Sequence, residues 1–92
     1  MTNERTNKQQ AFGAATRRFP LFELPIKRLI ETDENFRDIC EELAEAESAL
    51  SAVDKLPAPL RETRRAEWQA LVDRLVGEVE AAIGRPGSRT GH

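Results

Sequence analysis

The segment TDENFRDICEELAEAESALSAV, residues 32–53, decides the fold of this chain. Its apolar residues recur at spacings of three and four, which places them on one face of an α-helix. Two series with a spacing of seven run through it, namely Phe36, Leu43 and Leu50, and Ile39, Ala46 and Val53. This pattern is typical of a helix that packs along another helix, as in a coiled coil. Thr32 or Asp33 can cap the start of this helix.

A second helix is predicted beyond a turn that contains prolines. Pro57 and Pro59 interrupt helical geometry, so the first helix has to end before them. The next helix is predicted from about residue 60 to residue 83, with Gly84 as its C-terminal stop. Its apolar side is formed by Trp68, Leu71, Val72, Leu75, Val76, Val79, Ala82 and Ile83. Two long helices joined by a short turn predict an antiparallel hairpin.

The chain before the hairpin has two segments of different character. Residues 1–18 are rich in polar side chains without a sustained period, which predicts a mostly disordered tail. Residues 19–31, FPLFELPIKRLIE, concentrate apolar side chains around two prolines, and Pro25 suits the first position of a short helix over about 25–31. Residues 85–92 are expected to form a second disordered tail, so the folded unit is predicted to span residues 19–84.

We therefore predict an all-α fold, an antiparallel two-helix hairpin with a short preceding helix. With successive residues placed 100° apart, the apolar arc of the second long helix spans about 140°, which is wider than a two-helix seam requires. The short helix can cover part of this surplus, and a second copy of the hairpin can cover the rest. A homodimeric four-helix bundle is the leading prediction, and a three-helix monomer closed by the short helix is the alternative.

Composition limits the environment and the partners. The net charge is -2 although a third of the residues are charged, so the whole protein has no strong field to attract nucleic acid or an anionic membrane. The single cysteine excludes an internal disulfide and fits a reducing compartment. No apolar run is long enough to cross a bilayer. We expect a cytoplasmic protein that has no membrane partner, and its charge balance disfavours binding of nucleic acid.

The cluster around Cys40 is the first candidate for chemistry. Cys40 lies close in sequence to four carboxylates, those of Glu41, Glu42, Glu45 and Glu47. On a helical projection these carboxylates disperse, and most face solvent, so a solvated helix face is favoured over a metal or acid–base site. The single histidine, His92, is at the end of the chain. We therefore predict no catalytic residue, no metal ligand and no cofactor, and expect a protein that is not an enzyme.

The second candidate is an interaction surface at residues 17–28, RRFPLFELPIKR. This segment can pack on its own hairpin, exchange onto a partner or touch a membrane surface. Packing on its own hairpin is favoured because the bundle needs cover, and a membrane anchor of this length with Glu23 in its middle is disfavoured. The candidate interaction residues, here and on the last helix, are Phe19, Leu21, Phe22, Leu24, Trp68, Leu71 and Val76.

The third candidate is an anion site at the start of the last helix. Arg61, Arg64 and Arg65 lie where cations oppose the helix macrodipole. Guanidinium groups beside free N–H groups suit phosphate, so these residues support an anion- or nucleic-acid-binding function as the alternative. Pairing of these arginines with Asp54 and Glu47 across the turn is the favoured interpretation.

The stretch LIETDENFRDICEEL, residues 29–43, resembles the YdcH-like short helical-hairpin proteins of proteobacteria. Those proteins have a similar Leu-Ile pair, acidic stretch and Phe leading into a long helix, followed by a turn and a second helix. The resemblance implies a helical hairpin of unassigned function and carries over no active site. Together with the candidates above, it leads us to expect a small protein–protein interaction module, with itself or another protein as partner.

Overall fold

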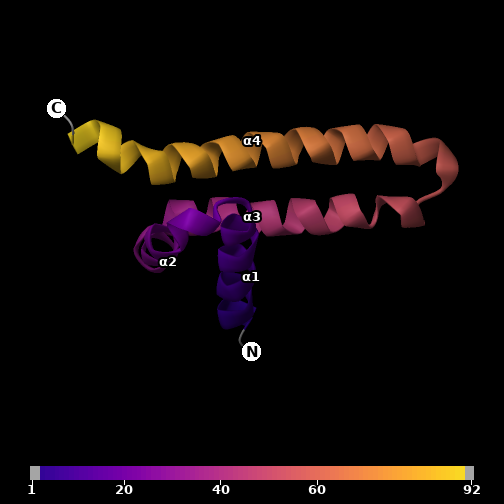
Figure 1. The fold of residues 1–92 in the computed structure, drawn as a ribbon. Coiled ribbons are helices and arrows are strands. Elements are labelled where there is room, and N and C mark those ends of the chain that lie inside the picture. Colours follow the sequence, from indigo (N-terminus) through magenta and orange to yellow (C-terminus); the bar gives the residue numbers. More distant parts are fainter. Residues whose placement is uncertain (1–2, 91–92) are drawn as a thin grey trace.

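The computed structural model describes residues 3–90 and the side-chain surroundings of residues 7–84. Within this part of the chain all regular structure is helical, which confirms the predicted all-α class. Its elements are α1 (Asn3–Arg18), the 3₁₀ turn η1 (Pro20–Phe22), α2 (Glu23–Thr32), α3 (Glu34–Ser51), the 3₁₀ turn η2 (Val53–Lys55) and α4 (Ala58–Thr90). Figure 1 shows α3 and α4 as an antiparallel hairpin, with α1 and α2 gathered at one end of it.

A single residue, Asp33, joins α2 to α3. Its backbone N–H donates to the carbonyl of Leu29 at 2.7 Å, which closes the last turn of α2. Its carboxylate Oδ1 accepts from the N–H of Phe36 at 3.1 Å, which caps the first turn of α3. Of the two predicted caps, Asp33 is therefore the one in use, while the hydroxyl of Thr32 donates to the carbonyl of Arg28.

The core lies between α2, α3 and α4 and follows the predicted apolar faces. From α3 it takes Phe36, Cys40, Leu43 and Ala46, and from α4 it takes Val72, Leu75, Val79 and Ile83. Ile26 and Ile30 of α2 complete this part. Ile39 and Leu50 of the predicted seam are only half-buried. Cys40 is fully buried.

Helix α1 corrects the predicted disordered tail for residues 3–18. Ala11, Ala14 and Ala15 are fully buried in the core, with Phe12 packed beside them. The spacing of three and four puts the alanines on one face, and their small side chains let two helix backbones approach closely. This contact also accounts for the burial of Cys40. Cys40 lies seven residues before Glu47 and so on the same side of α3, and Glu47 is ion-paired with α1.

The bounds of the hairpin helices differ from the prediction at three points. Helix α3 ends at Ser51, earlier than the apolar series suggests, and η2 continues the chain. Helix α4 begins at Ala58 and continues beyond Gly84 to Thr90, so the predicted stop and the predicted disorder of residues 85–90 are wrong. A glycine stop needs the left-handed conformation, and no glycine of the described chain has a positive φ. Residues 91–92 lie outside the described residues.

The two ends of the hairpin are covered differently. At the proximal end, which holds the start of α3 and the second half of α4, α1 and α2 complete the core. At the distal end, residues 49–68, Figure 1 shows the end of α3, η2 and the start of α4, and α1 reaches this end at Ser51, which lines the groove between α1 and α3. Every residue from 58 to 67 is exposed there, and Leu50 and Trp68 are half-buried. The distal end is therefore less covered than the proximal end, and Val53 of η2 is the buried residue within it.

Candidate functional site

The segment of residues 19–24, called the arm below, is the part of the surface with the most exposed apolar side chains. Helix α1 ends here because Pro20 has no N–H with which to continue it. Phe19 still donates its N–H to the carbonyl of Ala15 at 2.9 Å, and its side chain packs against the core. Leu21 and Leu24, by contrast, are 91% and 73% exposed.

The structure divides the predicted interaction residues into two groups. Phe19, Trp68, Leu71 and Val76 are half-buried and pack against the core. Leu21, Phe22 and Leu24 are exposed, with Phe22 the least so at 39%. The favoured packing of the arm on its own hairpin therefore holds for Phe19 and fails for Leu21 and Leu24. Helix α1, which was not predicted, packs on α3 and adds its own cover to the core.

Cys40 is fully buried, and its thiol has a raised pKa. Burial raises the pKa of its thiol from 9.0 to about 12, and the neighbouring charge of Glu41 acts in the same direction. Because the thiolate is the nucleophile, a thiol with this pKa is unreactive at neutral pH. Within residues 7–84, no group of His, Cys, Asp and Glu side chains could hold a metal ion.

Glu47 has a structural role that the sequence did not indicate. Its carboxylate accepts from Arg17 Nη2 at 3.1 Å and from Arg18 Nε at 2.6 Å, and its side chain is only 19% exposed. At the other end of α1, Lys8 Nζ lies 3.7 Å from Glu31 Oε1. These ion pairs hold α1 against α2 and α3. The alanine spacing of α1 and the two arginines before Pro20 were the available sequence signals.

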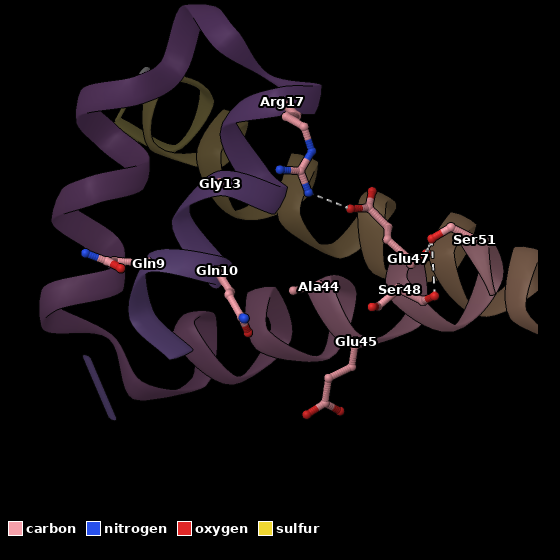
Figure 2. A pocket seen from close by; sticks show the side chains of 9 residues that line it. All are labelled: Gln9, Gln10, Gly13, Arg17, Ala44, Glu45, Glu47, Ser48 and Ser51. Carbon is pink, nitrogen blue, oxygen red and sulfur yellow. Dashed lines mark hydrogen bonds and ion pairs between the residues drawn. The ribbon is translucent and has the colours of Figure 1, made fainter. Parts of the chain in front are cut away.

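A shallow groove of about 390 Å³ lies where α1 meets α3 (Figure 2). The ion pair between Arg17 and Glu47 spans it, and Ser51 donates its hydroxyl to the carbonyls of Glu47 and Ser48. The remaining lining is Gln9, Gln10, Gly13, Ala44 and Glu45. The Arg17 and Glu47 side chains bond to each other, and the Ser51 hydroxyl is bonded to backbone carbonyls, so no hydroxyl of this groove is hydrogen-bonded to a side chain that could act as its general base.

The three arginines at the start of α4 each have an acceptor in the chain. Arg61 Nε donates to the carbonyl of Leu56 at 2.8 Å, and Arg64 pairs with Glu67 at 2.8 Å. Arg65 pairs with Asp54 at 3.0 Å, which confirms that part of the predicted pairing. The predicted pairing with Glu47 is wrong, because Glu47 is bonded to α1.

No protein-family model, curated protein or solved structure matches this chain. The resemblance to the YdcH-like hairpin proteins therefore stays a prediction. Within the described residues, no helix combines the length and the apolar character that crossing a bilayer requires. The geometry of the chain itself has to carry the functional proposal.

Proposed function

We propose that this protein is a small, non-catalytic helical module for protein–protein interaction and that the arm is its contact surface. The observation that carries the proposal is the exposure of Leu21 and Leu24, at 91% and 73%, with Phe22 between them. Burying a leucine side chain contributes about 1.5–3 kcal/mol. Adjacent exposed apolar side chains of this size mark contact sites on small proteins.

The arm is presented by a firm support, which favours binding. Phe19 is anchored in the core, and Pro20 and Pro25 limit the backbone on either side of the exposed leucines. A segment that is already ordered loses little conformational entropy on binding.

The free, buried Cys40 fits a reducing compartment, so we propose a cytoplasmic location for the protein.

The leading partner in this proposal is a second copy of the chain. One arrangement is a four-helix bundle, in which the bare distal ends of two hairpins cover the half-buried Trp68 and Leu71, and Val76 lies at the edge. The arm is the stronger contact surface of the two, because Trp68, Leu71 and Val76 already pack partly in their own core. Contact through the arm and contact through the distal end are separable by mutation.

The experiment replaces Leu21 and Leu24 together by serine. We expect sedimentation velocity at micromolar concentration to show self-association for the original chain and a monomer for this variant, with an unchanged circular dichroism spectrum. Leu60→Ser is the matched control, because Leu60 is 44% exposed at the distal end. A variant that keeps all self-association, and all partners recovered by cross-linked pull-down, would refute the role of the arm.

Binding of an anion or nucleic acid through Arg61, Arg64 and Arg65 is the alternative with less support. Each of these guanidinium groups already donates to a carbonyl or carboxylate of its own chain. Salt-dependent retention on heparin that disappears when all three become glutamine would favour this alternative. Retention that persists in the triple variant would exclude it.

A further inference from the structure

The outer face of α2 combines apolar and cationic side chains. Leu24 is followed by Lys27 and Arg28 at spacings of three and four, so these side chains lie next to one another on the helix surface. All three are exposed, whereas Ile26 and Ile30 on the opposite face are buried. Leu21 precedes Leu24 in η1 and extends the apolar part. We call Leu21, Leu24, Lys27 and Arg28 the α2 patch.

Lys27 and Arg28, the cations of the α2 patch, have no carboxylate partner among residues 7–84. Among residues 7–84, the cations found in ion pairs are Lys8, Arg17, Arg18, Arg64, Arg65 and Arg74. Lys27 and Arg28 are therefore free of ion pairs in this part of the chain. Helix α2 has two carboxylates, and that of Glu31 pairs with Lys8 at 3.7 Å. Glu23 is therefore the remaining negative charge of α2, against the two positive charges of Lys27 and Arg28.

The outer face of α3 has the opposite charge. Glu34, Asp38, Glu41 and Glu45 follow one another at spacings of four, three and four, so they form one stripe on the helix. We call them the acidic ridge. Among residues 7–84 none of the four has an ion-pair partner, and all but the half-buried Glu41 are exposed. Only Asp33 separates α2 from the start of this ridge.

We infer that the α2 patch binds a second copy of the chain in a twofold-symmetric contact. Leu21 and Leu24 of the two protomers pack on each other around the axis, and Lys27 and Arg28 of each protomer meet the acidic ridge of its partner. This inference rests on the proposed function and names the contact surface within it. It places the twofold axis at α2, and not at the distal ends of the hairpins.

Charge complementarity is what identifies the occupant as a second copy. Each chain has a cationic face and an acidic ridge on consecutive helices, and neither has an ion-pair partner among residues 7–84, so a twofold contact forms every charged pair twice. The apolar leucines then form the centre and the charges the rim, which is the usual anatomy of such contacts. Rim charges set specificity and are screened by salt. Self-association should therefore weaken as ionic strength rises.

A charge exchange tests the inference. One variant has Lys27→Glu and Arg28→Glu, and the other has Asp38→Lys and Glu45→Lys. We expect each variant alone to raise the Kd of self-association about tenfold or more. Mixing the two variants should restore a complex, because the reversed charges of one chain then meet the reversed charges of the other. Sedimentation velocity in roughly 0.05 M and 0.5 M salt measures all of these states.

The matched controls reverse charges at the distal end, by Lys55→Glu and Glu62→Lys, where both residues are exposed. They should leave the Kd within about twofold of the original value. Self-association that is indifferent to Lys27→Glu with Arg28→Glu, or that mixing does not restore, overturns the contact named here and leaves the arm proposal standing. A chain that stays monomeric in all conditions overturns both self-association and this inference, while the pull-down with the Leu21 and Leu24 variant still tests the interaction function.

Discussion

The proximal and distal ends of the hairpin are built from the same two helices and differ in cover. Leu43 and Leu50 lie on the same stripe of α3, seven residues apart. Leu43 is fully buried, because α1 and α2 complete the core around the proximal end. Leu50 is half-buried and lies one turn beyond Glu47, where ion pairs hold α1 against α3.

Burial along α4 shows the same contrast, and Trp68 is the example. It falls in the middle of the apolar stripe, yet it remains half-buried, while Val72 and Val79 further along that stripe are fully buried. The apolar pattern of one helix therefore does not by itself decide which of its positions are buried.

The largest expected difference between the ends comes from removing leucine side chains. Leu43→Ala should lower the free energy of unfolding by about 2–5 kcal/mol, because it leaves a cavity in a closed core. Leu50→Ala should cost about half as much, since water already reaches that side chain. Urea denaturation followed by circular dichroism gives both values. Equal losses would mean that the distal end is covered in solution, for example by a second chain.

The second expected difference comes from adding volume. Ala14→Leu should lower the free energy of unfolding by about 1–3 kcal/mol, because Ala14 is fully buried between closely packed helices. Ala66→Leu, at an exposed position of the distal end, should change it by less than about 0.5 kcal/mol. Thermal unfolding of the two variants measures the contrast. A neutral Ala14→Leu would show that α1 does not pack closely in solution.

The third comparison concerns the ion pairs at the two ends. Glu47 is 19% exposed and bonds to two arginines, whereas Asp54 is 82% exposed and bonds to one. Glu47→Gln should cost about 1 kcal/mol and Asp54→Asn close to zero, because solvent screens an exposed pair. Urea denaturation at low and high salt separates them, with a salt-dependent loss expected only at Glu47. A larger loss at Asp54 would contradict the assignment of Glu47 as the link between α1 and α3.

The smallest effect appears only in alkali and concerns Cys40. Its pKa is raised from 9.0 to about 12 in the fold, so the folded state holds the thiol proton more tightly than the unfolded state. Stability from this group is complete below pH 9.0 and is lost as the pH rises toward about 12. Cys40→Ala should flatten the stability profile in this range. Thiol labelling at neutral pH should likewise be slow until the chain unfolds.

The hairpin could be predicted from the sequence because its buried residues are large and periodic. Phe36, Leu43, Val72 and Val79 carry a strong apolar signal at helical spacing, and Asp33 marks the start of α3. The all-α class and the short helix before the hairpin followed from these local signals.

Helix α1 could not be predicted in the same way, because its buried face consists of alanines. Ala11, Ala14 and Ala15 bury little area each, and their value lies in the close approach they allow to another helix. Whether the alanines can make this approach depends on the surface of α3, and the local sequence of residues 1–18 contains no information about that surface. The exposure of Leu21 and Leu24 also departs from the predicted packing of the arm on its own hairpin.

The connection between α2 and α3 at Asp33 is short and hydrogen-bonded on both sides, which restricts motion of the arm relative to the core. One residue ends α2 through its N–H and begins α3 through its carboxylate, so neither helix can swivel without breaking a hydrogen bond of the other. A force applied to the arm by a partner therefore passes along α2 into the N–H of Phe36, whose ring is enclosed in the core. The arm is therefore connected, through α2 and Asp33, to a helix whose first turn packs in the core.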